Sequence, residues 1–139
     1  MAPSKELPLD SRRSLQSILA GKSILIVEDE PLVALDLHTT LSTVEASLIS
    51  AASAGEAITL IGYAEVSAAI VDVQLGSEDA AQVCDLLASR QIPFLFYTGR
   101  ADTTILRAAW PDVPVLKKPA TSAAIVAALE AVFDPAPNH

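Results

Sequence analysis

The sequence of 139 residues is long enough for one domain and short for two, and its 51% hydrophobic and 19% charged residues indicate a chain that folds around a core. A net charge of −8 argues against nucleic acid or an anionic membrane as the main partner, and the single cysteine, Cys84, excludes an intramolecular disulfide or a cysteine zinc cluster. The first ten residues contain no apolar signal segment and no apolar stretch reaches membrane-spanning length, so we expect a cytoplasmic protein.

Residues 1–21 are expected to form an N-terminal extension of different charge. Residues 1–22 hold four basic and two acidic side chains, which leaves the remainder of the chain with a net charge of −10. Leu15, Ile18 and Leu19 follow helical spacing ahead of Gly21, a pattern that predicts a short helix with a glycine stop. Such a helix either packs on its own domain or contacts a partner, and the sequence leaves both possibilities open.

From Ser23 onward, short apolar runs alternate with segments of helical spacing. The apolar runs predict strands at 24–27, 47–52, 68–71, 93–97 and 113–116. Helical spacing predicts helices at 31–44, 54–61, around 83–87, 103–109 and 121–132. Pro31 fits the first turn of the first helix, and Thr121 is a suitable N-cap for the last.

These five strand–helix units predict an α/β fold. Several strands are apolar throughout, which is typical of strands buried on both faces. Right-handed crossovers then place helices on both faces of a parallel sheet. Five units suit a flavodoxin-like, doubly wound (βα)5 sheet with strand order 2-1-3-4-5. We assign residues 22–134 to this domain and residues 135–139 to a C-terminal tail.

Polar side chains stand where the predicted strands end. Because ligands bind outside the carboxyl ends of strands in an open parallel sheet, these side chains are expected to converge at one edge. The group comprises three carboxylates, one hydroxyl and one ammonium, from Glu28, Asp29, Asp72, Thr98 and Lys118.

This combination of side chains indicates phosphoryl chemistry. Clustered carboxylates repel one another unless a positive charge joins them, and Mg²⁺ prefers one or two carboxylates together with waters and phosphate oxygens. An aspartate can act as a nucleophile that forms an aspartyl phosphate, which points to Asp72. Lys118 and Thr98 offer an ammonium and a hydroxyl to the phosphoryl oxygens. A plainer role remains open for Glu28 and Asp29, which could cap the helix that follows them.

The motifs resemble the receiver domain of two-component response regulators over roughly residues 22–134. Four strings carry the resemblance, in the order ILIVEDEPL at 24–32, AAIVDVQLG at 68–76, PFLFYTG at 93–99 and PVLKKPA at 114–120. In that family Asp72 matches the phospho-acceptor, Thr98 the hydroxyl residue, and Lys118 the lysine directly before the proline. The resemblance implies a bacterial protein that accepts a phosphoryl group from a histidine kinase. It would not be an enzyme beyond its own phosphotransfer and dephosphorylation.

The resemblance also implies a metal site and two modulating positions. Asp29, Asp72 and the backbone carbonyl of Gln74 would bind Mg²⁺ directly, while Glu28 would act through a water molecule. Gln74 and Arg100 occupy positions that line the access route to the phosphoryl group and tune its lifetime, although Arg100 also fits a solvated loop.

The sequence departs from the family pattern at Val115. The position three residues before the lysine is usually a tyrosine or phenylalanine whose rotamer follows the threonine. Val115 has no ring, so that switching mechanism is not expected here. Phosphotransfer is unaffected by this departure because Val115 is not a reacting group. Output is expected at the surface of the helix around 103–109, the strand at 113–116 and the last helix, through a downstream protein or a homodimer.

The string Pro-Phe-x-Phe-x-Thr-Gly at 93–99 resembles a subfamily of single-domain receivers recognised by a Phe-x-Thr-Gly motif. Those proteins tend to work with histidine kinases of the HWE or related type, some of them in general stress signalling. Five residues follow Asp134, so we expect no output domain. The protein would then signal by protein contact or serve as a phosphate sink for a shared kinase.

Three other functions fit the sequence less well. A Mg²⁺-dependent phosphatase with an aspartyl nucleophile usually needs a second carboxylate two residues on, where Gln74 stands. A non-phosphorylated interaction module would lack the acceptor or the lysine, and Asp72 and Lys118 are both present. A nucleotide-binding domain would need a glycine-rich phosphate loop after the first strand.

Four further side chains are expected to have structural roles. Cys84 reads as a small buried hydrophobe and His38 as a surface residue. Tyr97 is expected to pack in the core rather than to signal. Trp110 is expected to be partly buried, and a partner contact is its alternative.

Overall fold

The computed structural model describes residues 17–72, 77–99 and 104–133. It contains a parallel five-stranded sheet of order β2-β1-β3-β4-β5, which confirms the predicted doubly wound α/β fold. The strands are β1 (Ser23–Val27), β2 (Ser47–Ala51), β3 (Ala68–Val71), β4 (Phe94–Thr98) and β5 (Val115–Lys117). The helices are α2 (Pro31–Ser42), α3 (Ala54–Tyr63), α4 (Ser77–Ser89), α5 (Thr104–Ala109) and α6 (Ser122–Phe133).

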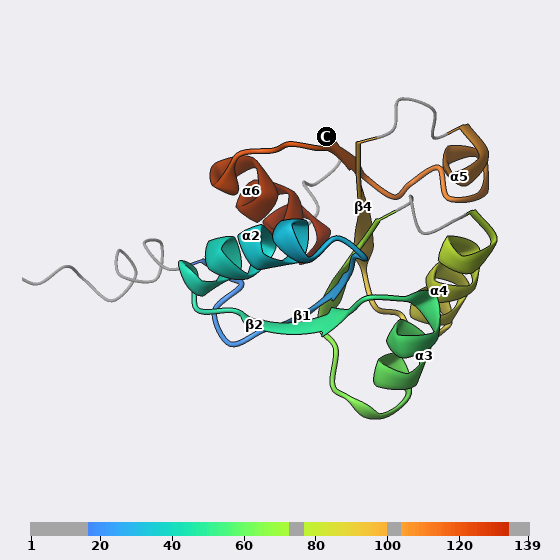
Figure 1. The fold of residues 1–139 in the computed structure, drawn as a ribbon, viewed down its shortest axis with the longest axis horizontal. Helices are drawn as coiled ribbons and strands as arrows, with labels where there is room; N and C mark the ends of the chain where they lie inside the picture. Colours follow the sequence, from blue (N-terminus) through green and yellow to red (C-terminus); the bar gives the residue numbers. More distant parts are fainter. Residues whose placement is uncertain (1–16, 73–76, 100–103, 134–139) are drawn as a thin grey trace, which may run out of the picture.

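Helices cover both faces of the sheet, with α2 and α6 on one side and α3, α4 and α5 on the other (Figure 1). Because side chains alternate along a strand, β1 contributes to two cores. Ile24 and Ile26 pack with side chains of α2 and α6, and Leu25 and Val27 pack with side chains of α3 and α4. Every residue of β3 and β4 is buried, as expected for strands that are apolar throughout.

Side chains and proline define three of the helix starts. The N–H of Glu56 donates to Oγ of Ser53 at 3.1 Å at the start of α3. The N–H of Ala124 donates to Oγ1 of Thr121 at 3.1 Å, which confirms Thr121 as the cap of α6. Pro31 is the first residue of α2, where its missing N–H would have had no partner within the helix.

Most element bounds differ from the predicted ones by a residue or two, and two differences have a clear physical reason. Strand β5 begins at Val115 rather than at residue 113, because Pro114 has no N–H to contribute to the strand ladder. Residues 18–21 form a turn that ends at Gly21, whose φ of 80° suits glycine. The rest of the short helix predicted before Gly21 and the tail at 135–139 lie outside the described residues.

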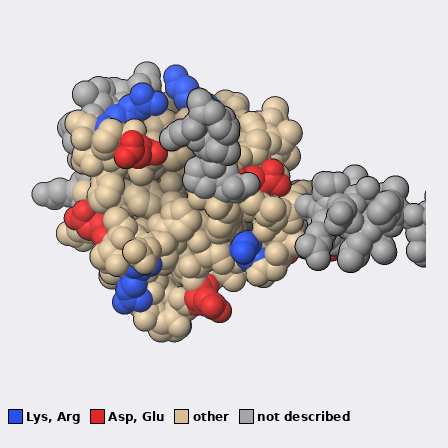
Figure 2. All heavy atoms as spheres, turned by 180° about the vertical axis from the view of Figure 1, so that it is seen from behind, with Lys and Arg blue, Asp and Glu red and all other residues tan. Residues whose placement is uncertain are grey.

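Charged side chains of both signs are interspersed among uncharged residues on the face shown in Figure 2. Within the described ranges, no helix combines the length and the hydropathy needed to cross a membrane.

Candidate phosphoryl-transfer site

The carboxyl ends of the parallel strands bring the predicted polar side chains to one edge of the sheet. Glu28 directly follows β1, Asp72 directly follows β3, Thr98 is the last residue of β4 and Lys118 directly follows β5. Backbone hydrogen bonds join neighbouring strand ends. The N–H of Asp72 donates to the carbonyl of Val27 at 3.0 Å, and the N–H of Lys118 donates to the carbonyl of Thr98 at 2.8 Å. The sheet therefore sets the separation of these side chains.

Lys118 lies at the centre of this group. Its Nζ is 2.8 Å from Oε1 of Glu28, 3.4 Å from Oδ2 of Asp72 and 3.8 Å from Oε1 of Glu30. The side chains of Glu28 and Asp72 are each 1% exposed and that of Lys118 is 12% exposed, whereas Glu30 is 61% exposed. Two buried carboxylates thus share one nearly buried ammonium, and Glu30 lies at the rim.

Burial and charge together shift the protonation of this pair. Burial raises the pKa of Glu28 from 4.5 to about 7; the hydrogen bond from Lys118 opposes this rise, and the neighbouring Asp72 adds to it. Burial alone would lower the pKa of Lys118, but its hydrogen bond to Glu28 and the charge of Asp72 outweigh that effect and raise it. The ammonium therefore stays charged at neutral pH, while Glu28 is poised to titrate.

The carboxylates also form a group that suits a hard cation. Ligand atoms of Glu28, Asp29 and Asp72 all lie within 4.8 Å of one another. Asp29 is exposed, so the group opens to solvent on its side. Mg²⁺ takes oxygen ligands and keeps several of its waters, which such a half-open set of carboxylates allows. The donor set therefore fits Mg²⁺.

Within the group, Glu28 is already engaged by the protein. Its Oε1 accepts from Lys118 at 2.8 Å, and its Oε2 accepts from the N–H of Glu30 at 3.1 Å. These two contacts count against Glu28 as a direct ligand.

Two further predicted residues, Thr98 and Val115, belong to β4 and β5. Thr98 is fully buried, and its partner in the register of β4 and β5 is Lys117. Val115 pairs with Phe96 and packs half-buried against the core of α3 and α4. Gln74 and Arg100, predicted as modulating positions, lie outside the described residues.

The four side chains that were expected to have structural roles lie in positions that agree with those roles. Cys84 is buried, and burial raises the pKa of its thiol to about 12. His38 is exposed on α2. Trp110 packs edge-on against Phe94, with ring centroids 5.7 Å apart. Tyr97 is 3% exposed and belongs to the core beneath α2 and α6.

Two contacts of Lys118 were not predicted from the sequence. One is the approach of Glu30, whose only signal is that it is the third acid in the run 28–30. The other is the ring of Tyr97, whose centroid lies 5.6 Å from Nζ of Lys118. An aromatic residue one position before the end of a strand is the signal that could have indicated this contact.

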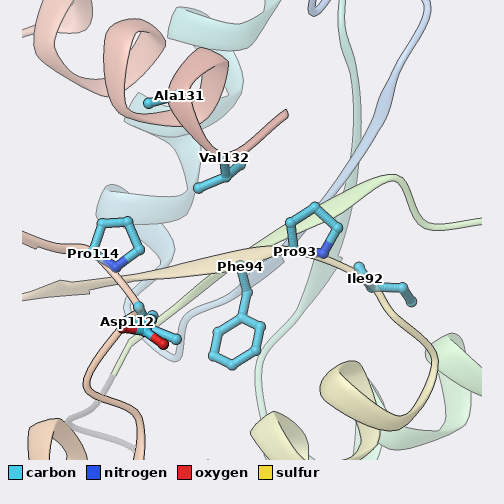
Figure 3. Close-up of a pocket in the computed structure, with 8 residues that line it drawn as sticks. Ile92, Pro93, Phe94, Asp112, Pro114, Ala131 and Val132 are labelled. Carbon is cyan, nitrogen blue, oxygen red and sulfur yellow. The ribbon is translucent and has the colours of Figure 1, made fainter. Parts of the chain in front are cut away.

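A separate pocket of about 320 Å³ lies at the opposite ends of β4 and β5 (Figure 3). Its lining comes from the segments that enter these strands and from α6, namely Ile92, Pro93, Phe94, Asp112, Val113, Pro114, Ala131 and Val132. Because the acidic group stands at the carboxyl ends of the strands, this pocket is not part of that site.

Comparison with known proteins identifies the family of the chain. Residues 24–130 match the family model of the response regulator receiver domain. No curated protein sequence matches the chain.

Several solved structures are similar to the chain. SdrG from Sphingomonas melonis Fr1 is 36% identical with a TM-score of 0.70, covering 81% of this chain and 96% of that one. The BeF3-activated conformation of SdrG from Pseudomonas melonis Fr1 is 38% identical with a TM-score of 0.67, covering 80% and 98%. A CheY-like receiver domain protein from Methanospirillum hungatei JF-1 is 20% identical with a TM-score of 0.73, covering 81% and 94%, and shares the fold.

Proposed function

Because the chain belongs to the response regulator receiver domain family of two-component signalling, we propose that it accepts a phosphoryl group from a histidine kinase on Asp72 and signals through protein contact. The observation that carries this proposal is the placement of Lys118 between Glu28 and Asp72. A buried aspartate at a strand end, with an ammonium 3.4 Å from its Oδ2, pairs a nucleophile with a group that neutralises incoming negative charge.

The proposed transfer is a single displacement at phosphorus. A carboxylate oxygen of Asp72 forms a new P–O bond while the P–N bond to the kinase histidine breaks. The imidazole leaves with the electron pair of that bond, and the product on this chain is an acyl phosphate. The ammonium of Lys118 and the hydroxyl of Thr98 are assigned to the phosphoryl oxygens, where negative charge must be balanced.

Mg²⁺ is the proposed cofactor, held directly by Asp29 and Asp72, with the backbone carbonyl of Gln74 as a further ligand and Glu28 acting through water. When bound, such an ion neutralises charge on phosphoryl oxygens and carboxylates alike. The hydrogen bonds that already engage both oxygens of Glu28 support its indirect role.

The proposed partners follow from the family and from the motif at 93–99. Receiver domains interact with histidine kinases and with downstream proteins, and the Phe-x-Thr-Gly string favours a kinase of the HWE type. The output surface is proposed to be α5, β5 and α6, which would contact a downstream protein or a second copy of the chain in the cytoplasm. The stand-alone form of response regulator is proposed from the Phe-x-Thr-Gly string at 93–99, which resembles that of single-domain receivers. A phosphate sink is the second candidate, since it needs the same acceptor and no output contact.

Labelling with a small-molecule phosphodonor tests the proposal. The purified protein is incubated with acetyl phosphate and Mg²⁺, and intact mass spectrometry measures uptake of one phosphoryl group. We expect uptake by the wild type, none by Asp72→Asn, and wild-type uptake by Asp36→Asn, an exposed aspartate of α2 that serves as control. Normal uptake by Asp72→Asn would reject the assignment. A pull-down with and without beryllium fluoride separates signalling from a sink, because a sink gains no partner on activation.

A further inference from the structure

Tyr97 makes two different contacts with the segment that carries Lys118. Its ring lies beneath the ammonium, with Nζ of Lys118 5.6 Å from the ring centroid. Its hydroxyl oxygen accepts a hydrogen bond from the N–H of Ala120 at 3.2 Å. One side chain therefore contacts both ends of the segment 118–120, which lies in the link between β5 and α6.

Strand alternation explains how Tyr97 reaches this segment. Neighbouring residues of β4 point to opposite faces, so Tyr97 joins the core beneath α2 and α6 while Phe96 joins the other core. Leu116, its register partner on β5, belongs to the same core. Lys118 lies two residues further along, on the same face as Leu116. Tyr97 therefore contacts Lys118 from the core beneath α2 and α6.

A lysine needs such support to act at a defined point. Its ammonium is a compact charge on a flexible four-carbon stem, and its direction is set by what surrounds it. An aromatic face attracts a cation, most strongly where water is excluded. Tyr97 is 3% exposed and the Lys118 side chain 12% exposed, so the pair is largely shielded from solvent.

We propose that Tyr97 is a positioning residue for phosphoryl transfer to Asp72, one that holds Lys118 over the acceptor through its ring and fixes the 118–120 segment through its hydroxyl. This inference rests on the proposed function and extends it. The two contacts of Tyr97 described above are with Lys118 and with the N–H of Ala120, and neither residue is a proposed metal ligand. Removal of Tyr97 should therefore affect the step that Lys118 serves and leave binding of Mg²⁺ intact.

Two substitutions separate the two contacts. Tyr97→Phe keeps the ring and removes the bond to Ala120, whereas Tyr97→Leu removes both. Tyr63→Phe is the matched control, because Tyr63 is the second of the two tyrosines and is 75% exposed on α3. At saturating Mg²⁺, we expect labelling by acetyl phosphate to slow about three- to tenfold in Tyr97→Leu, a factor set by the strength of a cation–π contact. Tyr97→Phe should fall between that variant and the wild type, and Tyr63→Phe should match the wild type.

Two further readouts distinguish positioning from general loosening. The affinity for Mg²⁺, measured by calorimetry, should stay within about twofold of wild type in both Tyr97 variants. Neither substitution changes a carboxylate that is proposed to bind the ion. The ¹³Cε signal of Lys118 should shift in Tyr97→Leu as the ring current is lost, and it should stay near its wild-type position in Tyr97→Phe. Equal losses of rate and of Mg²⁺ affinity, or wild-type rates with an unmoved Lys118 signal, would overturn the inference.

The nuclear magnetic resonance measurement needs no phosphorylation. If the wild type fails to take up a phosphoryl group, the proposed function fails, and the Lys118 signal still reports whether Tyr97 holds the lysine. If Tyr97→Leu does not fold, the proposal is tested with Tyr97→Phe alone, through its rate of labelling and the amide chemical shift of Ala120. A wild-type rate with an unmoved Ala120 signal in that variant would contradict the role of the hydroxyl.

Discussion

The ammonium of Lys118 lies closer to Glu28 than to the proposed acceptor Asp72, at 2.8 Å against 3.4 Å. Glu28 therefore competes with Asp72 for the ammonium of Lys118, which lies within 3.4 Å of both carboxylates. Phosphorylation of Asp72 would add negative charge next to Lys118 and draw it away from Glu28. The pair Glu28–Lys118 is thus the contact that the proposed reaction must loosen.

Lys118→Met should destabilise the metal-free protein at neutral pH. Removing the ammonium leaves two buried carboxylates facing each other, and breaking a buried ion pair in this way costs about 3 kcal/mol. The free energy of unfolding, measured by urea titration at pH 7, should therefore fall by about 3 kcal/mol. Lys117→Met, at the exposed neighbouring position, is the control and should change it little. Equal stability of Lys118→Met and the wild type would show that the carboxylates need no countercharge.

Asp29→Asn should weaken Mg²⁺ binding without weakening the fold. Asp29 is exposed, so its substitution should change the free energy of unfolding by no more than about 0.5 kcal/mol in the metal-free protein. Loss of a directly ligating carboxylate should lower the Mg²⁺ affinity at least about tenfold by calorimetry. Asp36→Asn provides the control. An unchanged Mg²⁺ affinity in Asp29→Asn would show that Asp29 does not bind the ion.

The metal-free protein should lose stability as the pH rises from about 4.5 to 7. The pKa of Glu28 in the fold, about 7, lies above its unfolded value of 4.5, so the folded state holds the proton more tightly. The stabilisation from this group is complete below pH 4.5 and is lost as the pH rises through 7, by up to about 3 kcal/mol. Unfolding of wild type and Glu28→Gln in the presence of a chelator, compared at each pH, isolates this contribution. A constant difference between the two proteins across that range would contradict it.

Val115→Tyr should leave phosphoryl uptake close to the wild-type rate. Val115 is half-buried in the core of α3 and α4, and its apolar side chain has no group that could donate to, accept from or attack the phosphoryl group. The larger ring should cost about 1–3 kcal/mol of stability through overpacking. Thermal unfolding measures that cost, and labelling by acetyl phosphate measures the rate. A large change in rate with the stability preserved would give position 115 a part in the chemistry.

The sequence was sufficient to predict the sheet and the edge at which the site forms. The apolar runs that end in Glu28, Asp72 and Thr98 predict buried parallel strands, and such strands bring their carboxyl ends together. The end of β5 was also predicted to within one residue, although the strand begins after Pro114 rather than at residue 113. These features depend on the local pattern of apolar residues, which a single sequence contains, and on the right-handed crossover, which is general for parallel strands.

The partners of Lys118 could not be predicted in the same way. Whether its ammonium contacts Glu28, Asp72 or Glu30 depends on side-chain rotamers and on distances across three strands. The spacing of apolar residues in a sequence gives no information on either. The contact with Tyr97 arises because alternation on β4 and on β5 sends both side chains to one face. That geometry follows only once the register of the two strands is known.

Mapping the phosphoryl group to one residue tests the central claim most directly. The wild-type protein is labelled with acetyl phosphate and Mg²⁺ and then treated with borohydride, which reduces an aspartyl phosphate to homoserine. Peptide mass spectrometry then identifies the converted residue. The account predicts homoserine at position 72, in the labelled sample alone. Conversion at Asp29 or at another carboxylate, with Asp72 unchanged, would contradict it.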